Sequence, residues 1–159
     1  MPAAFRRVLV GTCASLLMAG CLSAVVGAQE QGSGPDRVVT FTKWITVSPG
    51  YPIMAGVTGG AAAGTFTGQV LEATTTVDGL VQRLVAVYEV HSGAHSFIAL
   101  IQGGGSQGKA ILDGRVLSGW LTGARVQVNF ETIYCAEPNA LGGVCFQGTI
   151  RLAGANEEQ

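Results

Sequence analysis

The sequence predicts an all-β fold: an antiparallel up-and-down β-barrel of about eight strands that follows an N-terminal signal peptide. Apolar and polar residues alternate along several short segments, and turn-forming residues separate these segments. No segment repeats its apolar residues at the period of a helix. The composition agrees with many short strands joined by tight turns, because only 12% of the residues are charged and 24 are glycine.

Residues 1–28 are interpreted as a signal peptide. Two arginines begin this stretch, an uncharged and mostly apolar run follows, and Val-Gly-Ala at residues 26–28 provides small residues at a cleavage site. We therefore expect a secreted, periplasmic or cell-envelope protein. An alternative is lipidation at Cys21, because residues 17–21 resemble a bacterial lipoprotein box. In that case acyl chains would hold the protein on a membrane, which is the only membrane association we expect.

The rest of the chain is expected to form one domain. Residues 29–36 read as a flexible lead-in, 37–153 as the barrel, and 154–159 as a disordered tail. Turns are expected where glycine and proline gather, at residues 48–56, 59–64, 78–79, 91–95 and 103–108. The expected strands are 37–47, 65–76, 80–90, 96–102, 109–117 with 119–121 (two short strands or one bent strand), 123–134 and 144–152.

The last two strands form the clearest hairpin. Val126, Val128 and Phe130 alternate with polar residues on the first arm, and a loop containing Pro, Asn and Gly separates it from the second. Cys135 and Cys145 flank this loop, and the other two cysteines belong to the leader. In an oxidising compartment this pair is expected to form a disulfide, because its spacing does not fit a CxxC metal or redox site.

The charge of the chain argues against nucleic acid as a partner. The formal net charge is −1, and without the two leader arginines seven basic residues remain against ten acidic ones. The chain has no basic cluster, whereas binding to phosphates requires several lysines or arginines on one surface. The same reasoning argues against attraction to an anionic membrane surface.

Glycine-rich segments carry a resemblance to a known superfamily. Thr58-Gly59-Gly60, together with Gly-Thr-Phe-Thr-Gly-Gln-Val at residues 64–70, resembles a turn-and-strand signature of the allene oxide cyclase and dirigent-type barrels. Residues 96–100 and 145–152 are similar to bacterial secreted proteins grouped with them. The resemblance implies an eight-stranded antiparallel barrel with an apolar cavity, often in an oligomer. The plant cyclases use a carboxylate and an Asn near the first strand, but residues 37–49 contain no Asp, Glu or Asn. The activity of the plant cyclases is therefore not carried over to this chain.

No catalytic motif is present, and the aromatic residues are the most informative candidates for a ligand site. Each falls on an expected strand, where it either fills the core or forms the wall of a cavity. These candidate ligand-binding residues are Trp44, Phe66, Tyr88, Phe97, Phe130 and Tyr134. Glu89, His91 and His95 could form a metal or acid–base group, but they flank a turn and are read as solvated loop residues. We expect no metal and no cofactor, since the glycine runs lack the Lys and the helix of a phosphate-binding loop.

Three functions remain open. The first is a non-catalytic barrel that binds a small hydrophobic molecule in its lumen. The second is a cyclase or isomerase that shapes an apolar substrate in the cavity. The third is a structural or partner-binding module, including a homo-oligomer, because the strand at residues 80–90 is apolar on both faces. A closed cavity with a buried carboxylate of raised pKa would favour the enzyme. A dry apolar cavity without titratable groups in its lining would favour the binder. A filled lumen with an apolar outer patch would favour the interaction module.

Overall fold

The computed structural model describes residues 37–47, 52–76, 78 and 80–154. The signal peptide at 1–28, lipidation at Cys21, the lead-in at 29–36 and the tail from residue 155 onward lie outside the described residues. The described part contains eight strands, which run in chain order as β1 (Arg37–Val47), β2 (Ile53–Gly60), β3 (Gly64–Thr75), β4 (Val81–His91), β5 (Phe97–Ser106), β6 (Lys109–Gly119), β7 (Arg125–Tyr134) and β8 (Val144–Ala153). Short 3₁₀ helices occupy Gly93–His95 and Leu141–Gly143.

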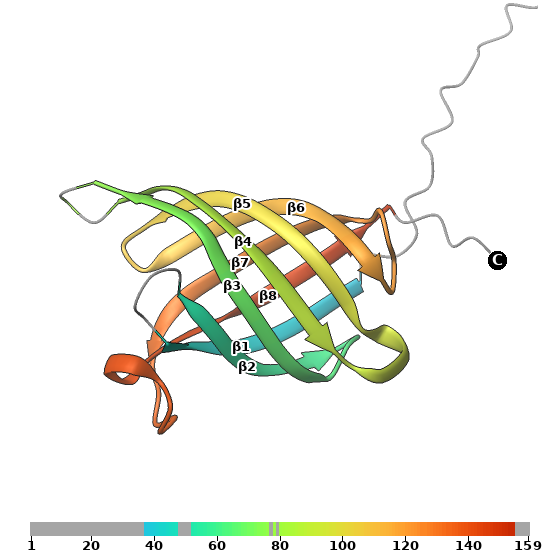
Figure 1. The fold of residues 1–159 in the computed structure, drawn as a ribbon, viewed down its shortest axis with the longest axis horizontal. Coiled ribbons are helices and arrows are strands. Elements are labelled where there is room, and N and C mark those ends of the chain that lie inside the picture. The colour runs from blue at the N-terminus through green and yellow to red at the C-terminus, as the bar shows by residue number, and fades with distance from the viewer. Residues whose placement is uncertain (1–36, 48–51, 77, 79, 155–159) are drawn as a thin grey trace, which may run out of the picture. The chain divides into compact units, whose positions relative to one another are not determined.

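The strands form a closed antiparallel barrel. Each strand pairs with the next, and β8 returns to pair with β1, so the sheet closes on itself (Figure 1). The closing register places Val39 opposite Ile150 and Trp44 opposite Cys145. Closure pairs every strand on both sides, which removes the exposed edges that promote aggregation. The predicted up-and-down barrel of about eight strands is confirmed. Among the described residues, no helix is long and apolar enough to cross a membrane.

Strand β2 is the main feature that the sequence analysis missed. Turns were expected at 48–56 and 59–64, but Ile53–Gly60 is a strand paired with β1 and β3. The chain turns at residues 61–63, within the second expected turn, and residues 48–51 of the first lie outside the described residues. Glycine has a low strand propensity, and close packing is what overrides it here. Gly56 lies opposite Lys43, and a Cβ atom at Gly56 would lie 2.9 Å from the Cα atom of Lys43. A side chain at this position would separate the two strands.

Strand β5 is also longer than expected, and β6 is continuous. The expected glycine loop at 103–108 is wrong for Gly103, Gly104 and Gly105, which continue β5, and only Gln107 and Gly108 turn the chain. Strand β6 runs without a break from Lys109 to Gly119, although a break was expected at residue 118. A Cβ atom at Gly103 would lie 2.8 Å from the Cα atom of Leu112, so these glycines permit close backbone pairing instead of marking turns.

One end of the barrel is filled by large side chains. Trp120, in the β6–β7 connection, packs against the core there and stacks on His95 with their ring centroids 4.4 Å apart. The guanidinium carbon of Arg37 lies 5.4 Å from the centroid of the Trp120 ring. Inside this end lie the buried residues Val39, Phe97, Val116, Val126 and Leu152. This end of the lumen is therefore a conventional packed core.

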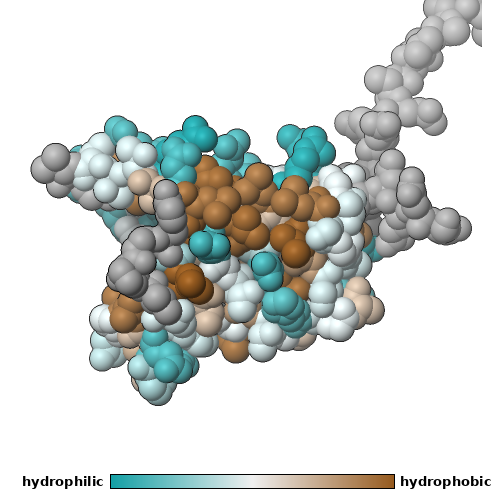
Figure 2. Space-filling view, in the orientation of Figure 1, coloured by the Kyte–Doolittle hydropathy of each residue, from teal (hydrophilic) through white to brown (hydrophobic). Residues whose placement is uncertain are grey.

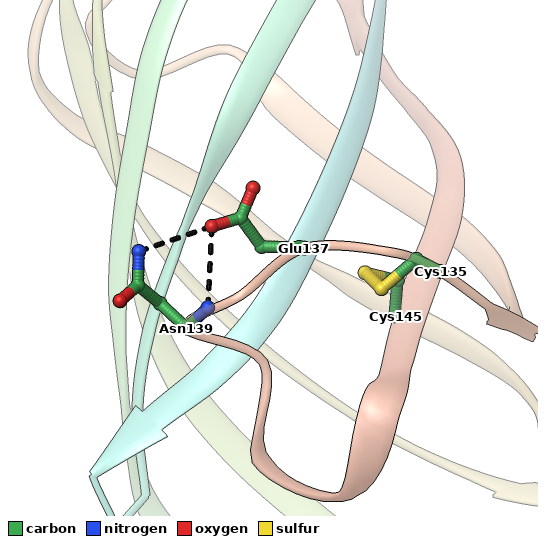
Figure 3. The surroundings of a disulfide bond; sticks show 4 residues. All are labelled: Cys135, Glu137, Asn139 and Cys145. Atoms are coloured by element: carbon green, nitrogen blue, oxygen red, sulfur yellow. Dashed lines mark hydrogen bonds between the residues drawn. A yellow bond between two sulfur atoms is a disulfide. The ribbon is translucent and has the colours of Figure 1, made fainter.

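The disulfide hairpin lies at the opposite end. Cys135 and Cys145 form the predicted disulfide between the end of β7 and the start of β8, with their Cα atoms 5.7 Å apart (Figure 3). The enclosed loop has its own hydrogen bonds, since a Glu137 carboxylate oxygen accepts bonds from the backbone N–H and the side-chain amide of Asn139 (Figure 3). Because Cys145 directly precedes Phe146, the disulfide holds the start of a strand that forms part of the lumen wall.

Candidate functional site

The lumen contains a cavity of about 350 Å³ at the end of the barrel away from Trp120. This volume lies within the range of small-molecule sites, which is about 300–1,000 Å³. The wall is mostly apolar, and its larger apolar residues are Ile45, Met54, Val70, Leu84, Phe130 and Phe146. Residues from all eight strands therefore enclose one apolar space.

Small residues keep this end of the lumen hollow. Ala86 on β4 and Ala110 on β6 face the cavity where the closed end of the barrel has larger side chains. Gly105 on β5 and Gly108 in the following turn also line the cavity and contribute no side chain to it. The cavity therefore results from small residues at these positions, since the inward-facing neighbours of the two alanines on their own strands are leucine and tyrosine.

A lysine lies at the base of this apolar cavity. Lys43 is on β1 in phase with the inward-facing Phe41, and it is only 2% exposed. Its amine donates a hydrogen bond to the hydroxyl oxygen of Tyr88, which is on β4 and 1% exposed. No other hydrogen-bond partner of this amine occurs among the described residues, and no Asp or Glu lines the cavity. The lysine is therefore buried without a counter-charge, which is rare for this residue type.

Aromatic rings surround the amine of Lys43. Its Nζ atom lies 4.2 Å from the ring centroid of Tyr88 and 4.3 Å from that of Phe130. The centroids of Phe41, Phe66 and Phe146 lie 5.3, 5.8 and 5.8 Å away. Five rings within about 6 Å form a cage that attracts a cation electrostatically. We call these five rings and the amine that they surround the lysine cage.

Burial determines the protonation of both polar groups. Desolvation lowers the pKa of Lys43 well below the ordinary value of a lysine, because the charged form loses its hydration and gains no carboxylate partner. The rings of the cage offset part of this cost. Desolvation also raises the pKa of the Tyr88 hydroxyl above its ordinary value. Burial thus favours an uncharged amine next to a phenol that keeps its proton.

The mouth of the cavity is polar. Thr75, Ser106 and Thr132 line it and are exposed, unlike the base. Lys109 is the other lysine of the chain, and its amine forms an exposed ion pair with Glu131 at 3.7 Å. An exposed pair of this kind contributes little to stability. The cavity thus runs from a solvated rim through apolar walls to one isolated polar pair.

The six aromatic candidates occupy different parts of the barrel. Tyr88 and Phe130 line the cavity, and Phe66 packs below it with its ring centroid 4.8 Å from that of Tyr88. Phe97 is buried at the closed end. Trp44 lies between inward-facing Lys43 and Ile45, so its side chain belongs to the outer face of β1. Tyr134 ends β7 and is 87% exposed. The cavity wall therefore includes two of the six, and contact of any of them with a ligand stays a prediction.

Sequence reasoning missed Lys43 and Phe146. The signal for Lys43 was present, because it occupies the apolar phase of an alternating strand, with Val39 and Phe41 before it and Ile45 after it. A lysine in that phase must either leave the core or be buried in it. Phe146 was assigned to the apolar side of its strand, and only the register of β1 and β8, which pairs it with Lys43, brings it to the amine.

The histidines do not form a common site with Glu89. The Nε2 atom of His91 lies 3.7 Å from a carboxylate oxygen of Glu89 and 3.3 Å from the hydroxyl oxygen of Thr67. His95 instead places its Nδ1 atom 3.1 Å from the carbonyl oxygen of Ala61 and stacks on Trp120. Within the described ranges, no three His, Cys, Asp or Glu side chains gather in a way that could hold a metal ion.

Comparisons with known proteins do not add a family to this picture. No protein-family model, no curated protein and no solved structure matches the chain. The resemblance to the allene oxide cyclase and dirigent-type barrels therefore stays a prediction, and the function must be argued from the cavity itself.

Proposed function

We propose that this protein is an exported β-barrel that binds a small hydrophobic molecule in its lumen without converting it. The observation that carries the proposal is the apolar cavity of about 350 Å³ with a single buried polar pair, Lys43 and Tyr88, at its base. Sites of this kind bind a ligand through apolar burial and orient it with a few polar groups. Export is proposed from the leader sequence, and the Cys135–Cys145 disulfide is compatible with an oxidising compartment.

The cavity supports a binder more than a cyclase or isomerase. A carboxylate of raised pKa in the lumen would favour acid–base catalysis, but the residues that line the cavity include no Asp or Glu. The titratable pair that is present differs from both expectations, since neither a carboxylate nor a purely apolar lining was found.

A titration with straight-chain alcohols of increasing length tests the binding proposal. NMR spectra of the protein labelled with nitrogen-15 should show saturable shifts at Tyr88 and Phe130, and calorimetry should give a negative heat-capacity change because apolar surface is buried. Ala86→Leu would fill part of the lumen and should weaken binding, whereas Val87→Leu changes an outward-facing residue of the same strand and should not. Shifts confined to the outer surface, or equal affinity in both variants, would contradict the proposal.

A second candidate function is self-association through the outside of the barrel. Figure 2 shows an apolar patch over β4 and β5. Val87 and Leu100 pair across these strands on the outer face, and Leu100 is exposed although it is large and apolar. Such patches mark interaction surfaces. Sedimentation of the wild type and of Leu100→Glu tests this function, which predicts an oligomer that the glutamate dissociates and is contradicted by a monomeric wild type.

A further inference from the structure

The two polar groups at the base of the cavity have the chemistry of a carbonyl-binding site. An uncharged amine has a free electron pair and is a nucleophile towards the carbon of an aldehyde or ketone. Lysines that form such bonds in other proteins are activated by desolvation in apolar pockets. Lys43 is desolvated, has no carboxylate partner among the described residues and lines an apolar space large enough for a small molecule. The Tyr88 hydroxyl at its amine supplies a proton donor and acceptor in contact with the reacting nitrogen.

We propose that the ligand is an apolar aldehyde or ketone, and that Lys43 binds it reversibly as an imine with Tyr88 transferring the protons. This inference rests on the proposed function, because the carbonyl compound must first enter the lumen. It adds the chemical class of the ligand and the residue that holds it. Packing alone does not explain a lysine here, because an apolar side chain at position 43 would fill the base of the lumen without burying an amine.

The bond changes balance without any further reactant. The electron pair of the Lys43 nitrogen attacks the carbonyl carbon, and the C=O bond opens as its oxygen takes a proton from the Tyr88 hydroxyl. The nitrogen returns one proton to the Tyr88 oxygen, which leaves a neutral carbinolamine. The C–O bond then breaks as Tyr88 protonates the departing oxygen, and the nitrogen electron pair forms the C=N bond while its last proton returns to Tyr88. One carbonyl compound and one amine thus give one imine and one water, with Tyr88 unchanged.

The lysine cage also suits the protonated form of the imine, which forms when the neutral imine takes up one proton from solvent. A protonated imine carries a positive charge at the nitrogen, where the centroids of Tyr88 and Phe130 lie 4.2 and 4.3 Å from Nζ. Ring faces stabilise a cation that has lost its hydration. The apolar wall also disfavours the reverse reaction, because hydrolysis of the imine requires water at the base of the lumen.

The rim limits which carbonyl compounds fit. Lys109 is the only cationic side chain in the cavity lining besides Lys43, and it is exposed and paired with Glu131. The cavity lining therefore offers no second buried cationic group that could bind a carboxylate or phosphate. This excludes sugar phosphates and keto acids as the preferred class of ligand. The walls favour a short aliphatic or aromatic carbonyl compound whose apolar part contacts residues such as Met54, Leu84 and Phe146.

The chain offers a matched control, because Lys43 and Lys109 are its only lysines. The protein is incubated with hexanal and sodium cyanoborohydride, which reduces an imine to a stable amine. Each trapped molecule adds the mass of hexanal minus one oxygen atom, and peptide mapping locates it. We expect the adduct on Lys43, formed at least about tenfold faster than on Lys109. Lys43→Met should abolish it and Lys109→Gln should retain it, and Tyr88→Phe should slow it at least about tenfold because the proton transfer is lost.

Hexanol separates failure of this inference from failure of the proposed function. It matches hexanal in size but cannot form an imine. Binding of hexanol in the lumen of the wild type and of Lys43→Met would show that the variant is folded. Its missing adduct would then result from the loss of the amine. Hexanol binding without an adduct on Lys43, or adducts confined to Lys109 and the chain terminus, would overturn the imine and leave the binding proposal standing. Absence of both hexanol binding and an adduct on Lys43 would overturn both.

Discussion

Lys43 and Tyr88 are 45 residues apart in the chain and lie on strands that are not neighbours, yet the amine of one donates a hydrogen bond to the hydroxyl of the other inside the barrel. Closure of the sheet brings β1 and β4 to face each other across the lumen. Neither group has a charged partner in the described part of the chain, so the pair is a polar contact enclosed by aromatic rings. The stability, pH response and ligand chemistry expected of this protein depend on that contact.

The first prediction concerns the energetic coupling of this pair. Lys43→Met leaves the Tyr88 hydroxyl unpaired and Tyr88→Phe leaves the amine unpaired, and a buried unpaired polar group costs about 1–3 kcal/mol. The double variant removes both groups, so we expect it to be more stable than either single variant and at least as stable as the wild type. Urea denaturation of all four proteins measures the coupling, and additive effects of the two substitutions would contradict the contact.

The second prediction concerns pH. The folded pKa of Lys43 lies below its unfolded value, so between these two values the unfolded chain binds one proton more than the native protein. The free energy of unfolding should therefore rise with pH in this window, by up to about 1.4 kcal/mol per pH unit. The stability gained in this way is lost as the pH falls through the folded pKa of Lys43, because the amine must then be charged in the native protein as well.

The window for this measurement ends near pH 10. Above about that value the unfolded tyrosine ionises while buried Tyr88 keeps its proton, which lowers the free energy of unfolding and opposes the lysine effect. No other titratable side chain faces the amine among the cavity-lining residues, since Lys109 lies at the exposed rim with Glu131. Denaturation of the wild type and of Lys43→Met from pH 6 to about 9.5 isolates the contribution of Lys43 to the pH dependence of the free energy of unfolding. Parallel pH profiles of the two proteins would show that Lys43 keeps its charge.

The third prediction concerns the glycine that faces Lys43. Gly56→Ala places a Cβ atom against the β1 backbone at Lys43, where the distance to its Cα atom would be 2.9 Å. Overpacking of this kind costs about 1–3 kcal/mol. Val57→Ala removes an exposed side chain on the adjacent position and should change the unfolding free energy by less than about 0.5 kcal/mol. Equal thermal stability of the two variants would show that β2 and β1 are less tightly paired than described.

The fourth prediction concerns the disulfide. Reduction of Cys135–Cys145, which encloses a sequence separation of 10, should lower stability by about 3 kcal/mol in the loop-closure model. Reduction should also lower the affinity for ligands in the lumen, because Cys145 holds the strand at Phe146, a wall residue of the cavity. Calorimetry with and without a reductant measures both effects. The double variant Cys135→Ser, Cys145→Ser controls for the reductant and should not respond to it, and unchanged ligand affinity after reduction would separate the hairpin from the cavity.

The overall fold was predictable because strand alternation is a local signal. Val126, Val128 and Phe130 show it clearly, and the loop flanked by Cys135 and Cys145 marks the final hairpin. Strand β2 was not predictable by the same reasoning, since Gly56 and its neighbours look like a turn until the backbone of β1 is placed against them. Tertiary packing decided that segment over local propensity.

The candidate site was predictable only in part. Aromatic residues on strands pointed to a lumen, and Tyr88 and Phe130 do line it. The lysine cage depends on register and closure, which place Phe146 opposite Lys43 and bring Tyr88 across the barrel. A strand pattern assigns each side chain to a face but not to a height along the barrel. Trp44 and Tyr134 show the limit, because a position on a strand did not bring either aromatic side chain into the cavity lining.

If the lumen above Lys43 is a ligand site, a crystal structure of the protein grown with hexanol should show the alcohol bound there. We expect electron density for the alcohol inside the barrel, with its chain against Met54 and Phe146 and its hydroxyl towards the Lys43–Tyr88 pair. A lumen filled by rearranged side chains, with the alcohol only on the outer face of β4 and β5, would contradict it.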